Sequence, residues 1–304
     1  MKKSLIALAA LAAAGVASAQ VTLYGVADVS LSKASGSSFQ MSGNGDLNNG
    51  NSRLGVKGSE DLGGGLTAAF QFEQAVNLEN GGSDAAAFQR TARASLAGGF
   101  GTLHLGRSLS PTFLGLAAWE LTGMANYSAA VAQFGFGGSA APRNSSAITY
   151  QTPQMGAVSA QIGYVNKADR ANSATVDNSK VDLNVVYAAG DVTAALTYNK
   201  ASNDASANYS LGGRYNMGTF SVAGSIQNPS GASRGITIGA AANLGVANLV
   251  FDIARDTGSA VKSTSYVFEA NRSLSKRTLA YFAVLRKGGA TAVTTSGAGL
   301  RHNF

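Results

Sequence analysis

Hydrophobic and polar residues alternate with a period of two along most of the chain after about residue 20. The segment 66–73 reads LTAAFQFE and the segment 181–187 reads VDLNVVY, with a hydrophobic residue at nearly every second position in each. Successive side chains of a β-strand point to opposite faces, whereas a helix would repeat its hydrophobic positions every three to four residues. The pattern therefore predicts an all-β protein.

Turn residues divide the chain after residue 20 into sixteen predicted strands. Short connections, such as 60–64 and 98–101, take turns with longer ones, such as 34–49. This rhythm is typical of an up-and-down antiparallel barrel with short turns at one end and longer loops at the other. The predicted strands are 21–33, 50–59, 65–78, 88–98, 101–109, 145–152, 157–166, 179–189, 191–201, 207–217, 218–228, 234–245, 247–256, 263–273, 276–286 and 294–304.

One connection, 110–144, is far longer than the others and shows no clear periodicity. A long connection inside a compact domain is usually functional or disordered. Disorder is disfavoured here because the segment contains Phe113, Trp119, Tyr127, Phe134 and Phe136. In a barrel we expect it to fold into the lumen as a constriction.

Charged residues are unevenly divided between the two sides of the predicted strands. A Lys or Arg that faces lipid costs about 2–4 kcal/mol at the bilayer midplane and about 0–1 kcal/mol near the interfaces. The hydrophobic side carries charges only near strand ends, at Arg90, Lys200, Arg234, Arg255 and Arg272. This distribution suits a hydrophobic side that faces lipid. A soluble β-sandwich, which would bury that side in a dry core, remains an alternative that periodicity alone does not exclude.

The N-terminus carries an export signal. Lys2 and Lys3 precede an apolar stretch, 5–16, and a small-x-small pattern ends at Ala19, directly before Gln20. This is the pattern of a secretory signal peptide, so we predict cleavage between Ala19 and Gln20. A membrane anchor would need a longer apolar run. The predicted organisation is a cleaved signal, 1–19, followed by a single transmembrane barrel, 20–304.

A helical membrane protein is excluded by hydropathy. No later run of 18 apolar residues exists, and the mean hydropathy is only +0.06. A barrel can still cross a membrane, because only alternate residues need to be apolar.

The remaining composition argues against nucleic-acid binding and catalysis. The formal net charge is +7, but the basic residues are scattered through strands of an exported protein, so we expect no nucleic-acid partner. The chain has no Cys and only two histidines, His104 and His302, too few for a metal site or a nucleophile with its base. A lipase would need a Ser–His pair on the lipid side; His302 has that parity, but an interfacial residue is the simpler interpretation. We expect no enzyme, cofactor or metal.

Several segments resemble the general diffusion porins of Gram-negative bacteria. The segment 21–25 (VTLYG) with Asp28 resembles their first strand, and 52–66 (SRLGVKGSEDLGGGL) resembles the second and third strands. The segment 100–107 (FGTLHLGR) is similar to the strand before the constriction loop, and the closing RHNF is similar to the porin C-terminus. The motifs are spread over the whole chain after residue 20.

The resemblance implies a sixteen-stranded barrel in the bacterial outer membrane, a homotrimer, an inward-folded third loop and a water-filled channel for passive diffusion of small hydrophilic solutes. It is strongest to the anion-preferring branch of beta-proteobacteria, whose constriction carries an arginine cluster. Outer-membrane lipid, small solutes and inorganic anions are the implied partners. An adhesin or a purely structural barrel would need longer outer loops than this chain has.

The resemblance also implies site residues. Arg53 and Arg143 stand at two positions of the arginine cluster. Thr91 occupies another expected position, and Arg93, two residues further on the same face, is the expected substitute. We also expect Arg107 and the loop acid Glu120 at the constriction, with the arginines facing Glu120. The alternative for each arginine is a solvated position without a steering role, and the alternative for Glu120 is an anchor of its loop through hydrogen bonds. Other expected lumen residues are Lys57, Glu73, Arg214 and Arg301, and Phe304 is the expected C-terminal assembly signal.

Overall fold

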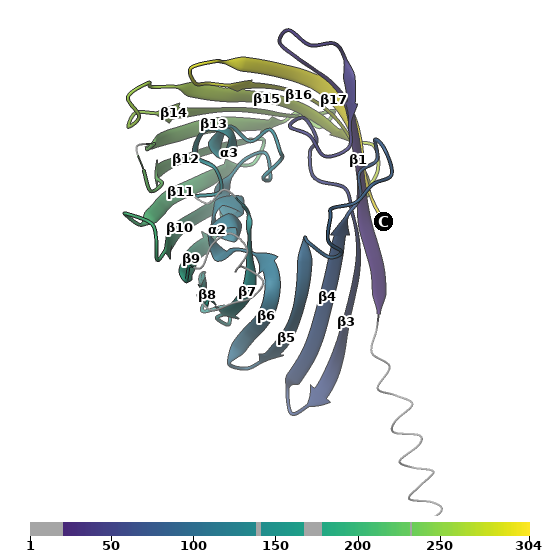
Figure 1. Cartoon of the computed structure of the whole chain (residues 1–304), viewed down its shortest axis with the longest axis vertical. Helices are drawn as coiled ribbons and strands as arrows, with labels where there is room; N and C mark the ends of the chain where they lie inside the picture. Colours follow the sequence, from purple (N-terminus) through teal and green to yellow (C-terminus); the bar gives the residue numbers. More distant parts are fainter. Residues whose placement is uncertain (1–20, 138–140, 167–177, 232) are drawn as a thin grey trace, which may run out of the picture.

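The computed structural model describes residues 21–137, 141–166, 178–231 and 233–304. Within them, sixteen long antiparallel strands form a closed barrel, and a short strand, β2 (Gln40–Ser42), lies beside the first (Figure 1). The barrel closes at β1 (Thr22–Ala34), which pairs with β3 (Arg53–Gly63) and with the last strand, β17 (Val293–Asn303). The predicted all-β barrel is confirmed.

All sixteen predicted strands are present, with ends shifted by a few residues. Most have about the 9–11 residues that a tilted transmembrane strand needs. The others are β4 (Leu66–Ala75), β5 (Thr91–Gly98), β6 (Gly101–Leu109), β7 (Arg143–Gln151), β8 (Val158–Val165), β9 (Lys180–Ala189), β10 (Val192–Ala201), β11 (Asn208–Met217), β12 (Phe220–Asn228), β13 (Gly235–Asn243), β14 (Asn248–Asp256), β15 (Thr264–Ser273) and β16 (Thr278–Lys287).

The hydrophobic side of the strands forms the outer surface. On β14, Phe251 is 46% exposed, whereas its neighbour Asp252 is 2% exposed. A soluble sandwich would show the opposite burial, so that alternative is excluded. An apolar outer belt around a polar interior is the arrangement of a barrel that spans a membrane. No helix in the described part of the chain is long and apolar enough to cross a bilayer.

The long connection spans 110–142, because β7 already begins at Arg143. Its described residues contain two helices that the sequence pattern did not predict, α2 (Pro111–Trp119) and α3 (Ala129–Phe134). The start of α2 has standard chemistry: Ser110 Oγ accepts a hydrogen bond from Phe113 N, and a proline opens the helix. Figure 1 shows both helices on the concave side of the sheet, where α2 contacts β8–β11 and α3 contacts β14–β16.

Helix α2 is attached to the inner face by hydrogen bonds and by a close ring contact. Asp182 Oδ1 accepts hydrogen bonds from Thr112 N at 2.8 Å and Thr112 Oγ1 at 2.6 Å. The Trp119 ring lies against Gly212, where an added Cβ would stand 2.2 Å from the ring. A glycine is therefore needed at position 212 for Trp119 to pack there.

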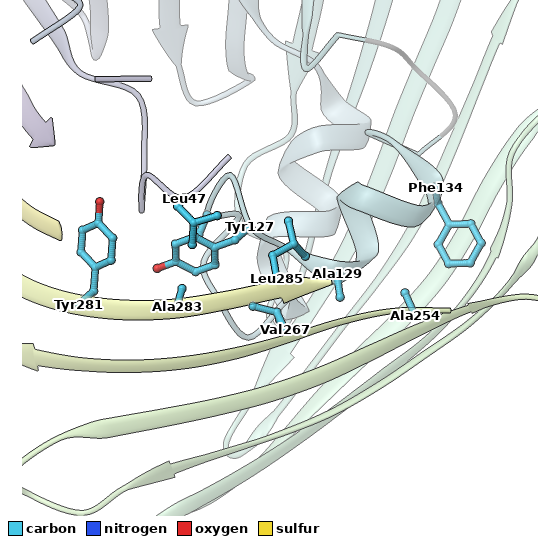
Figure 2. Packing of buried hydrophobic residues seen from close by; sticks show 10 residues of the cluster. Leu47, Tyr127, Ala129, Phe134, Ala254, Val267, Tyr281, Ala283 and Leu285 are labelled. Atoms are coloured by element: carbon cyan, nitrogen blue, oxygen red, sulfur yellow. The ribbon is translucent and has the colours of Figure 1, made fainter. Parts of the chain in front are cut away.

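The second half of the connection packs against other strands of the wall, β14–β16. Figure 2 shows Tyr127 and Phe134 of the connection in one buried cluster with Val267 of β15 and Leu285 of β16. Leu47, from the connection before β3, completes this contact. The two halves of the 110–142 connection are thus fixed to different strands of the inner face.

Candidate functional site

A cavity of about 550 Å³ lies between the inner face of β3–β7 and the 110–142 connection. Its wall side is lined by charged and amide side chains. Its other side is lined by mostly apolar residues of the connection, including Phe113, Leu114 and Met124. The charged residues that line it are Arg53, Glu73, Arg90, Arg93, Arg143 and Arg301.

Glu73 is the only carboxylate among the described residues that line the cavity. Its Oε1 lies 2.7 Å from Arg90 Nε, and its Oε2 lies 3.4 Å from Arg53 Nε. Tyr24 also donates a hydrogen bond to Oε2, at 3.1 Å. Tyr24 reaches this position because Gly55, opposite it on β3, leaves space for the ring; a Cβ at position 55 would be 2.3 Å from the ring.

Hydrogen bonds to neutral acceptors hold three of the arginines in place. Arg143 Nε donates to the carbonyl of Arg90 at 2.6 Å. Arg53 Nη1 donates to the carbonyl of Asn51 at 3.0 Å, and Arg301 Nη1 donates to Asn49 Oδ1 at 2.7 Å. A guanidinium carries five N–H donors, so a neutral acceptor fixes its direction without cancelling its charge.

The result is a strongly positive cavity. Five arginines and one carboxylate line it, a formal excess of four positive charges among the described lining residues. Charges beside a low-dielectric wall interact more strongly than in bulk water, and a cleft lined by one sign of charge raises the local concentration of counter-ions. This arrangement can attract and orient anions.

The structure brings together most of the predicted site residues. Arg53, Arg93 and Arg143 line the same cavity. Glu73 and Arg301, which we expected elsewhere on the lumen wall, join them there. Lys57 lines an adjacent hollow of about 370 Å³ together with Arg93. Arg214 is half-buried on β11 and does not line either hollow.

Two expected constriction residues lie outside this cavity. Arg107 sits at an irregularity of β6 between Gly106 and Ser108, and its side chain donates to the carbonyl of Gln89 and to Ser145 Oγ.

Glu120 is 1% exposed, and its carboxylate accepts hydrogen bonds from Thr122 Oγ1 at 2.7 Å and Met124 N at 2.9 Å. The expectation that the arginines face Glu120 is therefore corrected. The acid they meet is Glu73.

Arg90 is a cavity residue that the sequence analysis placed on the lipid side. It precedes β5, which begins at Thr91, so strand alternation does not govern its direction. Thr91 and Arg93 do follow the strand parity, since both line the cavity. The predicted strand began at 88, three residues too early, and this error placed Arg90 on the lipid side.

The C-terminal residue is integrated into the barrel. Phe304 exchanges two backbone hydrogen bonds with Gly25, each of 3.1 Å. Its ring lies against Gly25, where a Cβ would be 2.3 Å from the ring. The predicted signal peptide, 1–19, and the cleavage site at Ala19 and Gln20 lie outside the described residues.

Comparisons with known proteins agree with this architecture. A profile of the Gram-negative porin family matches residues 5–289. The chain is 34% identical to outer membrane porin protein 32 of Delftia acidovorans, over 75% of this chain and 69% of that relative. It is 30% identical to an outer membrane porin protein of Bordetella pertussis over the full length of both.

Solved structures show the same fold. The anion-selective porin from Comamonas acidovorans superimposes with a TM-score of 0.77 at 26% identity, covering 94% of this chain and all of that one. OmpT of Vibrio cholerae, in its trimer form, superimposes with a TM-score of 0.69 at 14% identity, covering 94% of this chain and all of that one.

The barrel, its apolar outer surface and these similarities agree on one function. The protein is a channel of the Gram-negative outer membrane, through which small hydrophilic solutes diffuse, and it is not an enzyme. The chain belongs to the Gram-negative porin family.

Proposed function

We propose that the arginine-lined cavity is the constriction of the pore and makes the channel prefer small anions to cations. The observation that carries this proposal is the charge of the lining: among the described residues, five arginines stand against one carboxylate, that of Glu73. The 110–142 connection supplies the facing side and narrows the pore. One of the similar structures is itself described as an anion-selective porin.

The expected strength of the preference follows from elementary electrostatics. Two unit charges about 4 Å apart interact by roughly 1 kcal/mol in bulk water, and by more beside a low-dielectric wall. One arginine thus favours an anion over a neutral solute by several-fold, and it disfavours a cation by a similar factor. Salt weakens the effect, since the Debye length is about 8 Å at physiological ionic strength.

The assembly is also part of the proposal. We propose a homotrimer in outer-membrane lipid, supported by the trimer form of a similar barrel. In this proposal, residues 1–19 are cleaved off during export, and the mature protein comprises residues 20–304.

The reversal potential in planar bilayers tests the anion preference. A channel with Arg53→Gln, Arg93→Gln and Arg143→Gln should lose most of its preference for chloride over potassium, because three of the five described arginines that line the cavity are removed. Arg272→Gln is the matched control. Arg272 is an exposed arginine on the outer surface, near the C-terminal end of β15, and it does not line the cavity. A triple variant with the wild-type reversal potential would remove these residues from the selectivity mechanism.

A further inference from the structure

Helix α2 has an apolar face that the barrel wall does not cover. Its buried residues, among them Leu116 and Trp119, lie on the side that contacts β9–β11. Phe113, Leu114 and Ala117 are only half-buried, and they line the cavity. A helix that is apolar around its whole circumference is normally buried on every side. The uncovered face of α2 is therefore an apolar surface inside a water-filled channel.

A pair of aromatic rings extends this surface. The ring centroids of Phe113 and Phe136 are 5.8 Å apart, and the ring planes are inclined by 46°, which is a favourable geometry for an aromatic pair. Both rings line the cavity, as does Met124, whose thioether is also a good partner for aromatic groups. This side of the cavity therefore matches a ligand that carries an aromatic ring.

The 110–142 connection brings no charge to its side of the cavity. Glu120 is its only acid, and it has no Lys or Arg. The Glu120 carboxylate is buried by its hydrogen bonds to Thr122 and Met124 and does not line the cavity. A ligand that fills the cavity thus meets charge on the wall side and an apolar surface on the other. Such surroundings suit a molecule with one anionic end and an apolar body.

Two arginines on the wall side keep donors available for the anionic end. Arg93 makes no hydrogen bond or ion pair with any described residue. Arg143 donates through Nε to the carbonyl of Arg90, which leaves its terminal N–H groups for a ligand. Arg53 and Arg90, in contrast, share the carboxylate of Glu73. Because a guanidinium binds a carboxylate through two parallel hydrogen bonds, this part of the wall suits a single carboxylate.

We propose that the cavity is a binding site for aromatic monocarboxylates that pass through the channel. The carboxylate binds Arg93 and Arg143, and the ring lies against Phe113, Leu114 and Phe136. A volume of about 550 Å³ falls within the range of about 300–1,000 Å³ that is usual for small-molecule sites, so a one-ring acid has room. The inference rests on the proposed function, because it requires that the cavity is the constriction of the pore.

Block of the chloride current in planar bilayers tests the proposal on the wild-type channel. Benzoate is added at neutral pH and compared with two other compounds. Shikimate is a ring acid of the same charge whose ring carries hydroxyl groups, and benzamide has the ring of benzoate without its charge. Benzoate should halve the current at about one tenth of the concentration that either other compound requires, because both its ring and its carboxylate are bound.

A substitution on the apolar face locates the site. Phe113→Gln should raise the half-blocking concentration of benzoate by about five- to tenfold. The value for shikimate should not rise, whereas a displaced connection would change both values. Phe39→Gln is the matched control, since Phe39 is 71% exposed directly before β2 and does not line the cavity. This control should leave the block by benzoate unchanged.

Several outcomes would overturn the proposal. Equal block by benzoate and shikimate would remove the aromatic part of the site, and equal block by benzoate and benzamide would remove its arginines. An equal loss in Phe113→Gln and Phe39→Gln, or parallel changes for benzoate and shikimate in Phe113→Gln, would remove Phe113 from the site.

The reversal potential of the wild-type channel in potassium chloride alone distinguishes the two levels of the account. A chloride preference combined with equal block by benzoate and shikimate would reject the aromatic site and leave the proposed function standing. The absence of a chloride preference would reject the proposed function, and the aromatic site with it.

Discussion

Arg90 Nε lies 2.7 Å from Glu73 Oε1, and only 10% and 9% of these two side chains are exposed. The backbone reinforces the pairing, since Arg90 N also donates to the Glu73 carbonyl at 3.2 Å. The pair joins the end of β4 to the residue before β5. Glu73 therefore offsets part of the positive charge at the cavity wall and positions the arginines beside it.

Replacing Glu73 should strengthen the anion preference. In Glu73→Gln the cavity loses its one described carboxylate while all five arginines remain, so the chloride-to-potassium permeability ratio should rise by several-fold. The reversal potential in a salt gradient measures this ratio. Glu60→Gln, an exposed acid at the far end of β3, should leave it unchanged. A lower ratio in Glu73→Gln would show that Glu73 acts chiefly by positioning the arginines.

Filling the space above Gly212 should displace the 110–142 connection. A leucine at this position would occupy the site of the Trp119 ring and push α2 away from the wall and into the pore. Single-channel conductance should fall. Gly213→Leu is the matched control, because a Cβ at position 213 makes only ordinary contacts, the nearest at 3.6 Å. Equal conductance in the two variants would contradict the packing role of Trp119.

Asp182 should contribute to the attachment of α2. In Asp182→Ala, the buried donors Thr112 N and Thr112 Oγ1 lose their acceptor, which costs about 1–3 kcal/mol for each buried donor left unsatisfied. The connection should open to added protease within 110–142, well before the barrel unfolds. Asp191→Ala, in the exposed turn between β9 and β10, serves as the control. Equal protease resistance in the two variants would show that Asp182 is dispensable.

The C-terminal aromatic residue should matter for assembly. Phe304→Ala removes the ring that covers Gly25, so we expect a smaller fraction of folded barrel in the outer membrane. The heat-dependent shift of the barrel in gel electrophoresis measures this fraction. Val21→Ala, an exposed residue directly before β1, should assemble normally. Normal assembly of Phe304→Ala would reject Phe304 as an assembly signal.

The barrel was predictable because each strand has one side that faces lipid and one that faces water, and this shows in its sequence. An outer apolar belt and a polar interior impose a period of two, so the alternation at 66–73 or around Asp252 fixed both the strands and their inward faces. Turn residues then set the number of strands. Arg93 was placed correctly by this rule, since it lies well inside β5.

Residues outside the strands need not alternate between lipid and lumen. The wrong predictions concern such residues. Arg90 precedes β5 and turns inward against the extrapolated parity. Helices α2 and α3 gave no helical signal, because one is apolar around its whole circumference and the other has only six residues. Glu120 was assigned to the pore because it is the only acid of its connection, but local hydrogen bonds to Thr122 and Met124 bury it instead.

The reversal potential of the wild-type channel tests the central claim most directly. It should be measured in a potassium chloride gradient, first at low and then at high total salt. We predict the sign of a chloride-preferring pore, and a potential that shrinks as the Debye length falls from about 10 Å at 0.1 M to about 3 Å at 1 M. A potential of zero, or one with the sign of a potassium-preferring pore, would contradict the account.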